Sequence, residues 1–124
     1  MKRLIAAGVL IVLVIGIYIS SYFYIDRVCE ETEKLLNECV SAYNNNQKIE
    51  TNITELENYW SNKEKVLSII LNHNSIDEIE LAIESLTVHS KYPQNEMFYE
   101  YSSTIDILLH QIMEDTVPSA HSIL

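Results

Sequence analysis

Glycine is missing from the whole sequence after residue 25, since the two glycines, Gly8 and Gly16, both precede it. That part of the chain therefore has no glycine-rich loop of the kind that cradles phosphate groups. Prolines are also few, with only Pro93 and Pro118 to interrupt the backbone. No segment shows the alternation of apolar and polar residues that is typical of strands. Together these features predict an all-helical chain.

Cysteine is scarce as well, with only Cys29 and Cys39. On one continuous helix, ten residues separate the two by about 15 Å, whereas a disulfide needs Cα atoms within roughly 7 Å. We therefore expect two free, partly buried thiols, with a crosslink between two chains as the alternative. Neither cysteine has a neighbouring histidine in the sequence, so nothing indicates a cysteine–histidine nucleophile.

Basic residues are few in residues 26–124, where six of them face eighteen acidic residues, a net charge of −12. Such a segment lacks the positive charge needed to neutralise phosphates, so we expect no nucleic-acid partner. The same charge should repel the segment from an anionic lipid surface. Solubility alone accounts for an acidic surface of this kind.

A long uncharged run, residues 4–25, is the most prominent feature that the sequence does contain. Its 22 residues would form a helix of roughly 33 Å, enough to cross a hydrocarbon core of about 30 Å. Aromatic residues gather at one end of the run, as in an interfacial belt: Tyr18, Tyr22, Phe23 and Tyr24. We predict a transmembrane anchor that contacts membrane lipid through residues 4–25.

A cleaved secretory signal peptide is the alternative to an anchor. Signal peptides have apolar regions of about 7 to 15 residues and end at a small-x-small site. This run is longer, and bulky residues precede the only small pair near its end, Ser20 and Ser21. We expect a single-pass protein of the cell membrane, with residues 1–3 in the cytoplasm and residues 26–124 forming an acidic extracytoplasmic domain.

Four amphipathic helices are expected, the first continuing from the anchor and ending at Asn44–Gln47. The second carries apolar residues in steps of four and three, the spacing of a helix that packs lengthwise on a partner: Ile49, Ile53, Leu56, Trp60, Leu67 and Ile70, with Ile69 widening the stripe. Lys63 interrupts this series, and we expect its aliphatic stem to lie along the apolar surface.

The segment "NHNSIDE" separates the second helix from the third. Ser75 and Glu78 fit the capping-box pattern, so we expect the third helix to begin there rather than a metal or catalytic cluster. Two further apolar faces follow: Ile76, Ile79, Ile83 and Leu86 in the third helix, then Phe98, Tyr101, Ile105, Leu108 and Ile112 in the fourth, which Pro118 should end. Short connections predict a small antiparallel helical bundle.

Possible chemistry is confined to Asp106, His110 and Glu114, which are spaced four residues apart on the fourth helix. This spacing would direct all three towards one metal ion, but it is equally that of a solvated helix face. One helix supplies too few ligands unless His73 or His89 joins it. We therefore expect no metal site, no cofactor and no catalytic residue, and regard Trp60 as a core residue rather than a ligand-stacking ring.

These features together resemble a known family. A basic-plus-apolar anchor, an acidic helix, Trp60, the block "LNHNSIDEIELAIESL" at 71–86 and the ending "SIL" are similar to the family catalogued as domain of unknown function 4363, found mainly in Gram-positive, spore-forming bacteria. The resemblance would cover essentially the whole chain. It implies a small membrane-anchored helical protein, without an assigned activity, cofactor, substrate or functional residue.

Three functions are open on this evidence. The first is a membrane-anchored interaction, scaffold or accessory protein with another protein as its partner. The alternative is an extracytoplasmic bundle that senses a ligand or binds a metal ion. An enzyme is the least favoured, because it would need side chains from separate helices to converge.

Overall fold

The computed structural model describes the backbone of residues 1–123 and the side chains of residues 1–114. Within this range the chain forms four helices and no strand, which confirms the all-α prediction. The helices are α1 (Lys2–Asn44), α2 (Glu50–Ile70), α3 (His73–His89) and α4 (Glu96–Ile123).

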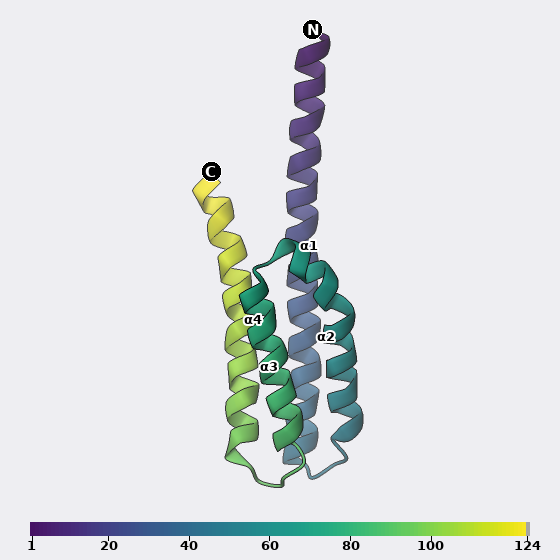
Figure 1. The fold of residues 1–124 in the computed structure, drawn as a ribbon, viewed down its shortest axis with the longest axis vertical. Coiled ribbons are helices and arrows are strands. Elements are labelled where there is room, and N and C mark those ends of the chain that lie inside the picture. Colours follow the sequence, from purple (N-terminus) through teal and green to yellow (C-terminus); the bar gives the residue numbers. More distant parts are fainter. Residues whose placement is uncertain (124) are drawn as a thin grey trace.

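The four helices form an up-and-down bundle (Figure 1). Each packs against two others, α1 against α2 and α4, and α3 against α2 and α4. The α1–α2 and α3–α4 connections lie at one end of the bundle, called here the distal end. The α2–α3 connection lies at the other end, where α1 projects beyond the bundle. Short connections between antiparallel neighbours give this arrangement, as the sequence predicted.

Helix α1 is a single uninterrupted helix of 43 residues. Residues 1–20 of it are exposed, whereas buried residues recur on one face from Ile25 onward. Thr32, the polar residue on this buried face, donates a hydrogen bond from its hydroxyl to the Val28 carbonyl at 2.7 Å. The apolar run and the first bundle helix are therefore one rod, with no glycine or proline between them.

The apolar face of α2 lies in the core as predicted, from Ile49 to Leu67. Lys63 is half-buried, and its ammonium lies 5.7 Å from the centre of the Tyr59 ring and 5.9 Å from that of Tyr24. These distances fit cation–π contacts and explain how a lysine is accommodated on this face. The prediction that Ile69 widens the stripe is wrong, because Ile69 is 84% exposed where the bundle ends.

The third helix begins earlier than the sequence predicted. Asn72 is the N-cap of α3, and its Oδ1 accepts a hydrogen bond from the Asn74 backbone N–H at 3.1 Å. The prediction that Ser75 and Glu78 form a capping box at the start of this helix is therefore wrong. Asparagine caps helices as well as serine does, and the earlier start adds a turn ahead of the buried Ile76.

Tyr43 joins α1 to the α3–α4 connection at the distal end. Its ring stacks on Phe98 with 3.9 Å between ring centres. Its hydroxyl donates a hydrogen bond to the Tyr92 carbonyl at 2.5 Å and accepts one from the Asn95 backbone N–H at 2.7 Å. The Asn95 side chain in turn accepts from the Met97 N–H at the start of α4. One tyrosine thus holds the α3–α4 connection against α1.

The fourth helix carries its predicted face into the core through Phe98, Ile105 and Ile112. Its predicted end at Pro118 is wrong, since α4 extends to Ile123. A proline within a helix removes one backbone hydrogen bond and crowds the carbonyl four residues earlier. That cost is local, so the helix continues on the far side of the ring.

Candidate functional site

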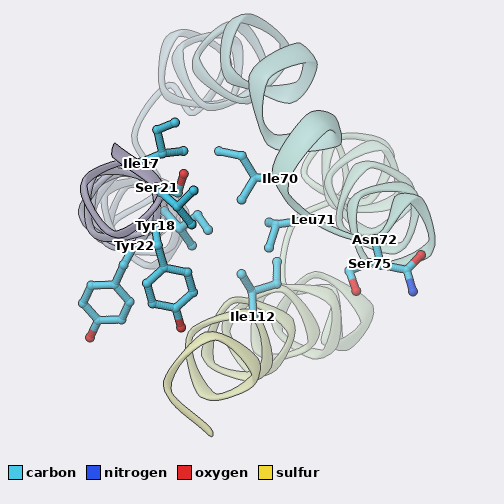
Figure 2. A pocket seen from close by; sticks show the side chains of 11 residues that line it. Ile17, Tyr18, Ser21, Tyr22, Ile70, Leu71, Asn72, Ser75 and Ile112 are labelled. Carbon is cyan, nitrogen blue, oxygen red and sulfur yellow. The ribbon is translucent and has the colours of Figure 1, made fainter. Parts of the chain in front are cut away.

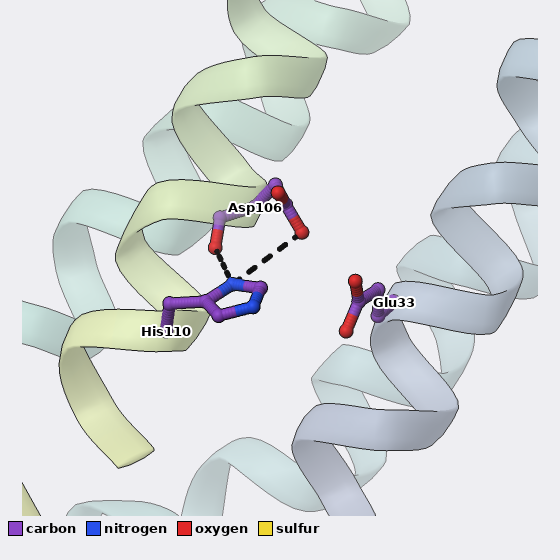
Figure 3. A group of neighbouring side chains, drawn as sticks. All are labelled: Glu33, Asp106 and His110. Carbon is purple, nitrogen blue, oxygen red and sulfur yellow. Dashed lines mark hydrogen bonds and ion pairs between the residues drawn. The ribbon is translucent and has the colours of Figure 1, made fainter. Parts of the chain in front are cut away.

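The bundle brings Asp106 and His110 of α4 next to Glu33 of α1 (Figure 3). Each residue offers one potential ligand atom, and these atoms lie within 4.8 Å of one another. Asp106 and His110 are one turn apart on α4, and α1 is the neighbouring helix. The result is a group of two carboxyls and one imidazole drawn from two helices.

A hydrogen bond within α4 fixes the orientation of the His110 ring. Its Nδ1 lies 2.8 Å from the Asp106 backbone carbonyl and 3.6 Å from the Asp106 Oδ1. A ring nitrogen facing a carbonyl carries the hydrogen, so Nδ1–H is the donor. The lone pair of the neutral ring is then on Nε2. Many metal-binding histidines are held in the same way, with one nitrogen bonded to an oxygen and the other on the metal.

The electrostatics of this group favour a positive charge. Burial raises the pKa of the Glu33 carboxyl, and a hydrogen bond with the Asp106 carboxyl raises it further. The pKa of His110 is raised by its hydrogen bond to the Asp106 carbonyl and then by the Asp106 carboxylate. Crowded carboxyls hold a proton more tightly because two negative charges repel. A divalent cation would relieve the same repulsion.

The sequence predicted only part of this group. Asp106 and His110 were candidates on spacing, whereas Glu33 was missed and Glu114 is not among the three. His89 is directed to the distal end, where its ring stacks on Tyr101 and its Nδ1 lies 3.0 Å from the Asn95 side chain. His73 lies at the start of α3, at the other end of the bundle. The partner of the α4 residues is therefore a carboxylate of α1.

A second acidic group lies between α2 and α3. Glu64, Asp77 and Glu80 have carboxylate oxygens within 4.8 Å of one another. A hydrogen bond with Glu64 raises the pKa of Glu80, and burial adds to this. No imidazole belongs to this group, so it offers only oxygen ligands.

The cysteines and Trp60 lie in the core. Cys29 and Cys39 are free and buried, as predicted. Burial, followed by nearby carboxylates, raises the pKa of each thiol to about 12. A protonated buried thiol is a poor nucleophile. Trp60 is buried against the other apolar residues, which confirms the interpretation as core rather than as a ligand platform.

Comparison with known proteins gives one result, a match to a protein family. No curated protein and no solved structure matches the chain. Residues 19–123 match the family described as domain of unknown function (DUF4363). The match leaves out residues 1–18, so it covers the bundle and only the end of the apolar run, less than the whole-chain resemblance expected. The chain belongs to this family of unknown function.

Proposed function

We propose that the protein is a single-pass, membrane-anchored accessory protein whose helical bundle contacts another protein on the extracytoplasmic side. The observation that carries this proposal is α1, which is long and apolar enough to cross a membrane. None of the residues in its most apolar stretch is buried within the part of the chain that the structure describes. In water that exposed surface would cost roughly 25 cal/mol per Å², and in lipid it would not.

The continuity of α1 supports a role that depends on position. Because the anchor and the first bundle helix form one rod, the bundle is held at a fixed height and angle relative to the membrane rather than on a flexible tether. The acidic surface of residues 26–124 favours a partner with a basic face, since complementary charge accelerates association.

Membrane extraction of the full chain with a C-terminal tag tests the anchor. Ile11 and Ile15 become lysine in one variant, and Val88 and Ile107, equally exposed apolar residues of the bundle, become lysine in the control. Each lysine within the anchor costs about 2.5 to 3.5 kcal/mol of insertion free energy. We expect the native chain and the control to stay in carbonate-washed membranes and the anchor variant to be released.

A soluble native product beginning near Tyr22 would instead identify residues 4–25 as a cleaved signal sequence. Protease treatment of intact cells tests the orientation, because an extracytoplasmic bundle loses its C-terminal tag. Retention of the tag in intact cells and its loss after lysis would place the bundle in the cytoplasm.

Binding of a divalent metal ion is a second candidate function, favoured by the convergence of Glu33 with Asp106 and His110. Imidazole with carboxylates suits zinc or manganese. We predict that the full chain in detergent micelles binds zinc in calorimetric titration, and that His110→Ala weakens binding at least tenfold, a loss of about 1.4 kcal/mol. His73→Ala, at an exposed position of α3, is the matched control. Equal affinity of the two variants would remove His110 from consideration.

A further inference from the structure

A cavity of about 510 Å³ lies where α1 leaves the bundle (Figure 2). Three parts of the chain surround it: residues 14–25 of α1, the α2–α3 connection, and Ile112 of α4. Figure 2 shows Ile17, Ile70 and Leu71 around the same space, with Ile112 closing it from α4. Its size falls within the range of roughly 300–1,000 Å³ typical of small-molecule pockets.

The lining of this cavity is apolar and uncharged. Among residues 1–114, whose side chains the structure describes, no acidic or basic residue lines the cavity, although residues 26–124 carry a net charge of −12. The polar groups that line it are hydroxyls and one amide, including those of Ser21, Asn72 and Ser75. A mostly apolar lining with a few polar groups suits an apolar ligand better than a charged one.

The position of the cavity along α1 indicates what reaches it. From Val14 to Ile25 the helix rises about 16 Å, roughly half the thickness of a hydrocarbon core. If residues 4–25 span the membrane, the cavity lies in the half of the bilayer next to the bundle. The exposed Ile69 and Val66 stand beside the α2–α3 connection. At that depth these two apolar side chains would face lipid, next to the exposed Asn72 and Asn74 of the connection.

We propose that this cavity holds one acyl chain of a membrane phospholipid, drawn from the bilayer leaflet next to the bundle. The inference rests on the proposed membrane insertion of residues 4–25. At this depth acyl chains are the surrounding solvent, and an unfilled cavity would forfeit the dispersion contacts of its lining. An acyl chain in place would join the anchor, the α2–α3 connection and α4 into one unit.

Photolabelling tests the proposal with the full chain in phosphatidylcholine nanodiscs that contain phosphatidylcholine bearing a diazirine in its acyl chain. Ile112 is the diagnostic residue, because it is only 4% exposed and lines the cavity, so that a diazirine inside the cavity would lie next to it. Ile105, buried two turns away on the same helix and outside the cavity, is the reference. Mass spectrometry should find adducts on Ile112 at roughly ten times or more the level on Ile105, the ratio that a difference of about 1.4 kcal/mol in access would give.

A matched pair of variants tests whether the acyl chain reaches Ile112 through the cavity. Ser21 lines the cavity, whereas its neighbour Ser20 is exposed on α1 and does not. Ser21→Phe places a ring in the space of the acyl chain and should abolish the excess of adducts on Ile112. Ser20→Phe should leave them unchanged. Both variants are first compared with the native chain by circular dichroism, and if Ser21→Phe does not fold, the ratio of Ile112 to Ile105 in the native chain decides.

Adducts on the exposed Ile11 separate the two proposals. Their absence would show that α1 is not in the bilayer, and the proposed function would fail together with this inference. Adducts on Ile11 without an excess on Ile112 would leave the anchor intact and overturn the acyl-chain site. Dimers that Ser21→Phe converts to monomers, without adducts on Ile112, would assign the cavity to a second copy of the chain and equally overturn it.

Discussion

At the scale of single residues, neighbouring carboxyls on different helices lower the stability of the fold at neutral pH, because their negative charges repel each other. Glu33 meets Asp106 across α1 and α4, and Glu80 meets Glu64 across α2 and α3. The pKa of Glu33 is raised by burial and then by the Asp106 carboxyl, and that of Glu80 by the Glu64 carboxyl and then by burial, so one carboxyl of each pair holds its proton more tightly than in the unfolded chain. Loss of that proton leaves two negative charges facing each other. The stability of the bundle should therefore depend on pH.

We predict that the bundle loses stability as pH rises from about 4.5 to about 8. The folded-state pKa of Glu33 is raised above its ordinary value of 4.5, so the folded state binds this proton more tightly than the unfolded state does, and stability is lost as pH rises. The pKa of His110 is raised above 6.5, so its contribution is complete below that value and is lost as pH rises through its folded-state pKa. The measurement is the thermal unfolding midpoint in detergent micelles by circular dichroism.

Glu33→Gln is the variant that isolates this carboxyl, because glutamine keeps the shape and a hydrogen-bond donor without the charge. Its unfolding midpoint should vary less with pH than that of the native chain. The control is Glu38→Gln, at an exposed position of the same helix. A native midpoint that falls as pH is lowered from about 8 to about 4.5, or equal pH dependence in the two variants, would contradict this account.

At the scale of the helices, the start of α3 is set by one side chain. We predict that Asn72→Ala lowers the free energy of unfolding by about 1 kcal/mol, because the Asn74 N–H loses its acceptor. Ser75→Ala should change it by less than about 0.5 kcal/mol, since Ser75 already lies inside the helix. Denaturant titration of both variants gives the comparison. A larger cost for Ser75→Ala would show that the capping box begins the helix after all.

The sequence predicted the helices better than their ends or their contacts. Steps of four and three residues identified the buried face of α2, because that spacing follows directly from helix geometry. Asn72 and Ser75 are both good caps, and which of them begins α3 depends on packing that local sequence does not carry. Exposure of Ile69 likewise depends on where the bundle stops. Glu33 and Asp106 are far apart in sequence, and their meeting follows only from the placement of α1 beside α4.

At the scale of the whole molecule, one core joins all four helices, and α1 runs the full length of it. Cys29 lies on α1 near the end of the bundle from which residues 1–20 project, and Cys39 lies about 15 Å farther along, towards the distal end. Both thiols are buried and belong to this core. They therefore report on the opening of two ends of the bundle.

We predict that the two cysteines are equally protected from alkylation, because four helices sharing one core should open together rather than from one end. Buried thiols with a pKa of about 12 react only after the bundle opens. Cys29→Ala and Cys39→Ala each leave one thiol, and the labelling rate of each full-length variant in micelles is compared with its rate in denaturant. Faster labelling of Cys39 by orders of magnitude would show instead that the distal end opens alone while the opposite end of the bundle stays folded. In that case the Tyr43 contacts with Tyr92 and Asn95 would be the weakest part of the bundle, and the core would not be a single cooperative unit.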